Sequence, residues 1–240
     1  MNSTSVCGRS LLPATWILAA FLTAPATADT WSPPGTCAYF SADRSWRLTV
    51  IPRDIESPLA YFQDKVDGRE PAGAVPGDRR ERARGVMEHR EKGQWRVVWD
   101  KPLLNEVSPV DAIVSSSGQA VTFDNWHSVG YGPDAVVIYD AQGKVVRALA
   151  LDDFLPENYI RALPRSVSSI HWGGEHCMTA DDKRVVLRVV VPSVQYRGDA
   201  KRQYVDVEVE LASGRIIAPS GPAWVGALAR AWMVNALSML

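Results

Sequence analysis

The stretch from residue 110 to residue 151 constrains the fold more than any other part of the chain, because its pattern suits antiparallel strands. Four short runs of strand-forming residues occur in it, at 111–115, 120–124, 135–140 and 145–149. Gly118 and Gly143 lie in the two tight turns, where glycine can adopt the positive φ that a hairpin needs. We therefore predict a four-stranded antiparallel unit of about 40 residues.

The same arrangement of strand, turn and strand recurs along the chain. Gly93, Gly143 and Gly214 each follow an alternating strand and precede a β-rich one, in EHREKGQWRVVW, IYDAQGKVVRAL and VELASGRIIAP. Further strands are expected at 46–51, 86–89, 94–99, 166–172, 183–191 and 204–211. The spacing of the three glycines is too irregular for a uniform array, but it fits repeated units that carry loop insertions.

These hairpins resemble the blades of WD40-like or YVTN-like β-propellers. The residues that carry the resemblance are VSSSGQAVTFDN and the following VVIYDAQGKVVRAL, which look like the inner and outer hairpins of one blade. Three units are visible, whereas closed propellers have at least about four blades. The resemblance implies a mainly β fold whose antiparallel hairpins form a small or incomplete propeller-like domain. An open or sandwich-like sheet is the alternative.

The first 28 residues have the three parts of a secretory signal. Arg9 is the single charge, residues 11–22 form an apolar core, and Ala26-Thr27-Ala28 is a small-x-small cleavage site. We expect cleavage after Ala28 and export to the periplasm or the medium. An uncleaved anchor is the alternative, although the apolar run is shorter than the ~20 residues of a spanning helix.

The rest of the chain divides into a β-rich domain at 29–221 and a helical tail at 222–240. The tail has apolar residues at near-helical spacing, interrupted by Arg230, and we expect a short helix that packs on the sheet or on a partner. A frayed end and a marginal membrane segment are the alternatives. Residues 53–85 are rich in glycine and charge, and we expect a solvated loop there. Its basic run 77–82 could bind an acidic partner or be a plain exposed loop.

Charge and cysteine content limit the classes of partner. The signal removes one arginine and no acid, so 26 − 1 = 25 basic residues against 27 acidic ones give the mature chain a formal charge of −2. This near-neutral balance gives no electrostatic argument for nucleic acid or an anionic membrane as partner. Export places Cys37 and Cys177 where disulfides persist, so we expect a bridge between them, with two buried free thiols as the alternative.

The loop 124–132 is the best candidate for a contact surface. A carboxylate, a carboxamide, an imidazole and two aromatic rings lie between two predicted strands, in Asp124, Asn125, Trp126, His127 and Tyr131. Loops mounted on a rigid sheet often carry function. We therefore expect an exported binding or scaffold domain for a protein or small ligand that the sequence does not name. The alternative is that these side chains cap the sheet and satisfy turn amides.

An exported hydrolase, in one version metal-dependent, is the second hypothesis. Its metal ligands would come from His127, His171, Glu175 and His176, with Asp124 orienting an imidazole. The spacing matches no standard zinc pattern, and the chain has no Gly-x-Ser-x-Gly, P-loop or dinucleotide-binding motif. No cofactor is therefore expected, and the sequence identifies no catalytic residue.

Overall fold

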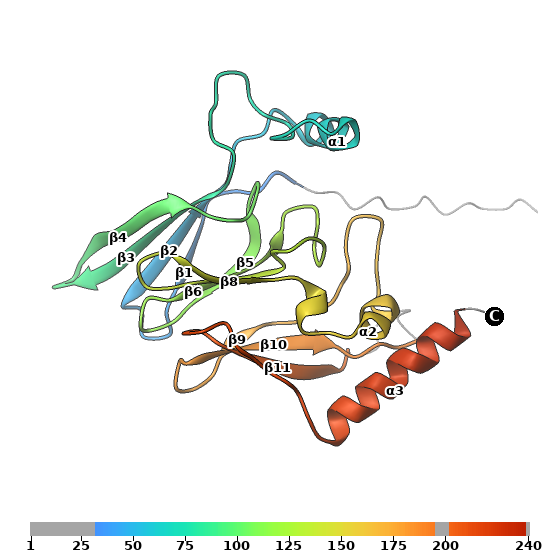
Figure 1. Ribbon diagram of the computed structural model, residues 1–240. Helices are drawn as coiled ribbons and strands as arrows, with labels where there is room; N and C mark the ends of the chain where they lie inside the picture. Colours follow the sequence, from blue (N-terminus) through green and yellow to red (C-terminus); the bar gives the residue numbers. More distant parts are fainter. Residues whose placement is uncertain (1–31, 195–201, 239–240) are drawn as a thin grey trace, which may run out of the picture. The chain divides into compact units, whose positions relative to one another are not determined.

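Three four-stranded antiparallel sheets make up most of the computed structural model, which describes residues 32–194 and 202–238. Each sheet is a meander of consecutive strands (Figure 1). The first sheet contains β1 (Cys37–Phe40), β2 (Trp46–Ile51), β3 (Arg84–Glu91) and β4 (Gln94–Pro102). The second contains β5 (Pro109–Val114), β6 (Ala120–Asn125), β7 (Val136–Tyr139) and β8 (Val145–Leu149). The third contains β9 (Cys177–Met178), β10 (Arg184–Val190), β11 (Tyr204–Glu210) and β12 (Ile216–Ile217).

This arrangement confirms the predicted fold class, a mainly β chain of blade-like antiparallel hairpins. In the part of the chain that the structure describes, there are three such sheets, one fewer than the smallest typical propellers have, and none of them closes into a barrel. The fold is therefore propeller-like and incomplete. The predicted signal, residues 1–28, lies outside the described residues.

Positive-φ glycines occupy the tight turns, as predicted. Gly93, Gly143 and Gly214 have φ of 83°, 73° and 68° and lie in the turns after β3, β7 and β11. Gly143 has a second constraint, because a Cβ built on it would lie 2.6 Å from Cδ2 of Trp99 in β4. The turn of the second sheet thus packs on the first sheet at a distance that only glycine permits.

The second sheet is buried on both faces, which explains why its central strands are so apolar. Phe123 and Ile138 belong to the core shared with the third sheet and the C-terminal helices. Val137 and Tyr139 point to the other side and join the core shared with the first sheet. All four residues of β7 are buried, as expected for a strand with a packed layer on each side.

Residues 53–85 are not the solvated loop that we predicted, because they contain the helix α1 (Pro58–Asp67). The Ser57 hydroxyl accepts a hydrogen bond from the Ala60 amide at 3.1 Å, and Gly68 ends the helix at φ 70°. Tyr61 on its inner side is 5% exposed and packs with Trp126. The composition of this segment favours a loop, whereas its serine cap and its proline in the first turn indicate the start of a helix.

Two short helical segments and one long helix accompany the third sheet: η1 (Leu151–Asp153), α2 (Glu157–Ala162) and α3 (Pro222–Leu237). The α3 helix confirms the predicted helical tail. Its Trp224 ring stacks on Tyr159 of α2 with centroids 5.4 Å apart, and Asn235 Nδ2 donates to the Asn158 carbonyl at 2.7 Å. Within the described residues, none of the helices combines the length and apolarity that a membrane crossing requires.

The predicted strand at 166–172 is wrong. This segment makes two isolated bridges, Arg165 with Ile170 and Gly173 with Val189, and no continuous ladder. The Trp172 amide donates to the carbonyl of Ile170, two residues earlier, at 2.9 Å, so the backbone bends where a strand would have to continue.

The predicted disulfide is also wrong, because Cys37 and Cys177 are free and exposed. Cys37 lies in β1, an edge strand of the first sheet, and Cys177 lies in β9, an edge strand of the third. A bridge needs Cα atoms within about 7 Å and facing Cβ atoms. Since both thiols are exposed, the alternative of two buried thiols is wrong as well.

Candidate functional site

Asp124 fixes the start of the loop that we predicted as a contact surface. It has φ 54° and is 7% exposed. Its carboxylate accepts hydrogen bonds from Trp172 Nε1 at 3.0 and 3.1 Å and from the Gly130 amide at 2.7 Å. Burial raises the pKa of Asp124 to about 6, against the opposing effect of these hydrogen bonds. The side chain therefore closes the loop on itself and on the chain segment before β9.

The next three residues of the loop also make internal contacts. The Asn125 Oδ1 accepts a hydrogen bond from the Glu106 amide at 3.2 Å, and Trp126 Nε1 donates to the Ser32 carbonyl at 3.0 Å. The His127 ring lies against Phe62 with centroids 3.8 Å apart. Tyr131, which is 37% exposed, is the member of the predicted set that reaches the surface most clearly. The binding role of the loop stays a prediction, and Tyr131 is the residue through which it can be tested.

The proposed metal ligands are not brought together. Across residues 32–194 and 202–238, no group of three or more His, Cys, Asp or Glu side chains is placed to hold a metal ion, so the set of His127, His171, Glu175 and His176 does not assemble. His176 instead stacks on Trp172 with centroids 4.8 Å apart, and its Nδ1 accepts a hydrogen bond from the Arg188 amide. Burial lowers the pKa of His176 to about 4, and the charge of Arg188 adds to this effect.

The hydrolase hypothesis gains no support from these contacts. The segments around Asp124 and His171 do meet, but they meet through the Asp124–Trp172 hydrogen bonds. The carboxylate proposed to orient an imidazole therefore bonds an indole and a backbone amide. No observation favours this second function, and it stays an untested prediction.

A pocket of about 830 Å³ lies where the loop ends. Ser128 and Tyr131 line it from the loop, together with Asn125 from the end of β6. Its charged lining is Lys65, Glu70, Glu81, Arg82, Glu106 and Asp134. Two basic against four acidic side chains give this lining a formal charge of 2 − 4 = −2. The pocket thus joins part of the predicted loop to residues that the sequence analysis did not single out.

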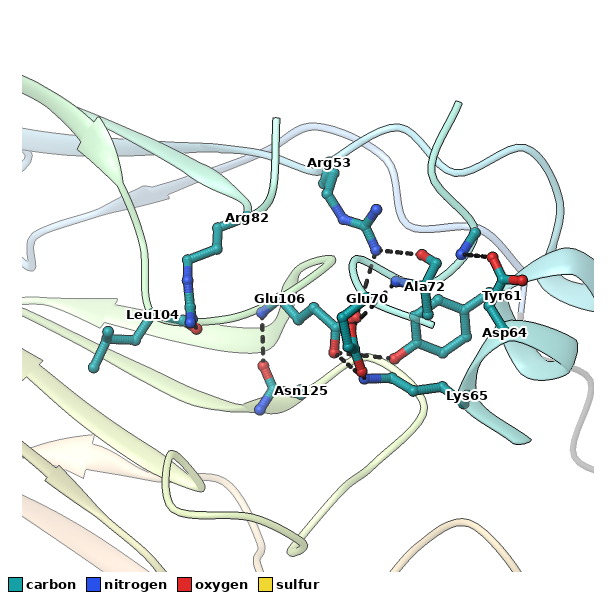
Figure 2. A network of polar contacts seen from close by, with 11 residues as sticks. Arg53, Tyr61, Asp64, Lys65, Glu70, Ala72, Arg82, Leu104, Glu106 and Asn125 are labelled. Atoms are coloured by element: carbon teal, nitrogen blue, oxygen red, sulfur yellow. Dashed lines mark hydrogen bonds and ion pairs between the residues drawn. The ribbon is translucent and has the colours of Figure 1, made fainter. Parts of the chain in front are cut away.

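An ion network connects α1 to one wall of the pocket (Figure 2). Lys65 Nζ lies 2.6 Å from Glu70 Oε1 and 2.9 Å from Glu106 Oε2. The Tyr61 hydroxyl donates to the same Glu106 oxygen at 3.3 Å. Burial lowers the pKa of Lys65, but the bonds to Glu70 and Glu106 outweigh this effect and raise it to about 12. Lys65 is therefore a permanent cation between two carboxylates.

Arg53 supports this network from inside the protein. Its side chain is fully buried, and its Nη2 donates to the Ala72 carbonyl at 2.6 Å and lies 3.5 Å from Glu106 Oε1 (Figure 2). Its Nε and Nη1 have no hydrogen-bond partner among the described residues. A buried arginine with one carboxylate neighbour is costly to separate from it. Glu106 is thus the centre of the network, held by Arg53, Tyr61 and Lys65.

Sequence reasoning missed this wall because it treated residues 53–85 as a loop. The signal was present: once Ser57-Pro58 is taken as a helix start, Tyr61 and Lys65 are four residues apart and share one face. No sequence signal pairs that face with Glu106, which comes from the connection between β4 and β5.

The fold and the pocket define a class of protein: a mainly β chain of three open, four-stranded antiparallel sheets with an acid-rich pocket at the end of one inter-strand loop. No protein-family model matches the chain, and no curated protein matches it. A solved structure that is similar is the crystal structure of TolB from Acinetobacter baumannii, with a TM-score of 0.29 and 12% identity. The match covers 78% of this chain and 33% of the TolB chain, so this chain spans about a third of that length.

Proposed function

We propose that this protein is an exported binding domain whose contact surface is the pocket at the end of the 124–132 loop. The observation that supports the proposal is the composition of that pocket. Exposed Tyr131 lines it beside Lys65 and Glu106, which bond each other, and buried Arg53 supports Glu106 from behind. Polar groups fixed by internal bonds are suited to orienting a ligand, because little order has to be created on binding.

The charges of the lining favour a ligand with a positively charged group. Lys65 is already paired with Glu70 and Glu106. Glu81 and Asp134 have no ion pair with a basic side chain among the residues described. Their carboxylates and the face of the Tyr131 ring would attract an amine or a guanidinium.

Thermal unfolding in the presence of amines tests this proposal. The probes are spermidine, arginine and choline, each added to the wild type and to the double variant Tyr131→Ala/Asp134→Asn. A ligand at about 100 times its Kd should raise the Tm of the wild type by roughly 5–10 °C. The double variant should show little or no rise.

The matched control is Phe40→Ala, which removes an exposed aromatic ring from β1, away from the pocket lining. This variant should respond to the probes as the wild type does. If no probe raises the Tm of the wild type, or if the double variant responds equally, the pocket is not the contact surface.

A further inference from the structure

We infer that a second surface pocket, beside the charged run 79–82, binds a small oxyanion with two or more negative charges, such as a polyphosphate or a polycarboxylate. This pocket has a volume of about 580 Å³. Five basic and two acidic side chains line it, for a formal charge of 5 − 2 = +3. The inference does not depend on the proposed function.

Two of the five cations are already neutralised and form fixed parts of the wall. Arg80 Nη2 is 2.8 Å from Asp78 Oδ2, and the same nitrogen contacts Asp54. Arg84 Nε donates to Asp100 Oδ1 at 2.5 Å, and its Nη2 bonds the other oxygen of that carboxylate. The hydrogen bonds with these arginines lower the pKa values of Asp78 and Asp100, so both pairs stay charged.

The other three cations keep an uncompensated charge. Arg82 Nη1 donates to the Leu104 carbonyl, and Lys101 Nζ donates to the Gln142 carbonyl at 2.7 Å, so neither has a carboxylate partner. Arg79 makes no side-chain hydrogen bond or ion pair within the described part of the chain. Glu81 is the remaining acid of the pocket lining. Because Arg80 faces two carboxylates, the five cations and four acids of this surface balance to 5 − 4 = +1.

Strand pairing explains why these charges gather. Arg84 begins β3 opposite Pro102 of β4, and Gly85 lies opposite Lys101. The run 79–82 leads directly into β3, so it lies at the end of the sheet where Lys101 is placed. Guanidinium groups offer several donors in a plane that matches the oxygens of phosphate and carboxylate groups. Because the cations are exposed, their attraction for an anion should weaken with salt.

The experiment is calorimetric titration of the full chain with inorganic phosphate, tripolyphosphate and citrate, at about 20 mM and about 200 mM NaCl. We expect tripolyphosphate or citrate to bind the wild type more tightly than phosphate, and more weakly at the higher salt. The double variant Arg79→Gln/Lys101→Gln should weaken binding by at least about tenfold, since it removes two charged donors. The two pockets share Glu81 and Arg82. Arg79 and Lys101 do not line the pocket of the proposed function, so this double variant tests the anion site alone.

Two further variants distinguish binding in this pocket from a general electrostatic attraction of anions to the protein surface. Arg165→Gln/Lys92→Gln removes the same charges at exposed positions outside the pocket and should leave the affinity unchanged. Glu81→Gln removes the unpaired acid and should strengthen binding by roughly threefold. The inference is overturned if the wild type binds no probe at low salt, if both double variants bind alike, or if Glu81→Gln brings no gain.

Discussion

The indole Nε1 of Trp172 donates to both carboxylate oxygens of Asp124, at 3.0 and 3.1 Å, across 48 positions of sequence. This contact joins the end of β6 in the second sheet to the segment that precedes the third sheet. Both residues are buried, and the carboxylate also accepts the Gly130 amide. One acid thus fixes a loop and ties two sheets together.

Asp124→Asn should therefore destabilise the fold by about 2–4 kcal/mol at neutral pH, because the new amide group cannot accept all of these donors. Urea unfolding followed by circular dichroism measures the change. Asp140→Asn is the matched control, since its carboxylate also accepts two backbone amides but lies in an open turn. The control should cost about 1 kcal/mol or less, and an equal loss in both variants would contradict the role given to burial.

His176 should make the protein less stable in acid. Its pKa in the folded protein is lowered to about 4, whereas an unfolded histidine has a pKa of about 6.5. The unfolded chain therefore binds the proton first, so this contribution to stability is fully present above about pH 6.5 and is lost as the pH falls toward 4. The full loss is at most about 3 kcal/mol.

Asp124 acts in the opposite direction, because its folded pKa is raised to about 6 from about 3.9 in the unfolded chain. Its contribution to the free energy of unfolding is fully present below about pH 4 and is lost as the pH rises through 6. His176→Gln separates the two effects, since glutamine keeps an acceptor and does not titrate. Between pH 7 and about 4.5, this variant should lose less stability in urea than the wild type does. The same loss in both proteins would contradict the pKa assigned to His176.

Gly143→Ala should be much more damaging than Gly93→Ala, although both glycines have positive φ. A Cβ at position 93 meets nothing within 4 Å, so we expect a backbone cost of about 1–2 kcal/mol there. At position 143 the Cβ would meet the Trp99 ring, which should add roughly 1–3 kcal/mol. Thermal unfolding of both variants measures the difference. Equal stabilities would show that the turn does not press on the first sheet.

Glu106→Gln should destabilise the protein by about 2–4 kcal/mol, because it leaves buried Arg53 without a carboxylate. Glu70→Gln is the control: its side chain is 58% exposed and pairs with Lys65, so its loss should cost about 1 kcal/mol or less. Denaturant unfolding of both variants provides the comparison. If Glu70→Gln proves the more harmful change, Glu106 is not the centre of the network.

Because the two thiols are exposed, a thiol reagent can test directly whether Cys37 and Cys177 are free or form a disulfide. Dithionitrobenzoate should react with Cys37 and Cys177 in the folded protein, without denaturant. The chain carries three cysteines, so cleavage after Ala28 would leave two reactive thiols and a retained signal would leave Cys7 as a third. If neither thiol reacts until a reductant is added, the result supports a disulfide between Cys37 and Cys177.

The strands of the second sheet could be predicted closely, because their side-chain alternation and turn glycines are local properties. The runs 120–124 and 145–149 became β6 and β8 with a change of at most one residue. The α1 helix was missed because composition was given more weight than its Ser57 cap. The pocket could not be predicted, since it needs Tyr131 and Lys65 from distant segments to face one space.

The sequence by itself determined where the chain turns tightly and which strands pair across those turns, because alternation and the φ freedom of glycine act between near neighbours. The tertiary structure decided which polar side chains are used in internal hydrogen bonds and which remain accessible to a ligand. Asp124 and His176 looked like reactive groups in the sequence. In the fold, Asp124 is a buried hydrogen-bond acceptor and His176 is a half-buried one. Burial depends on residues that arrive from elsewhere in the chain, and it sets both the pKa of a group and its access to a ligand.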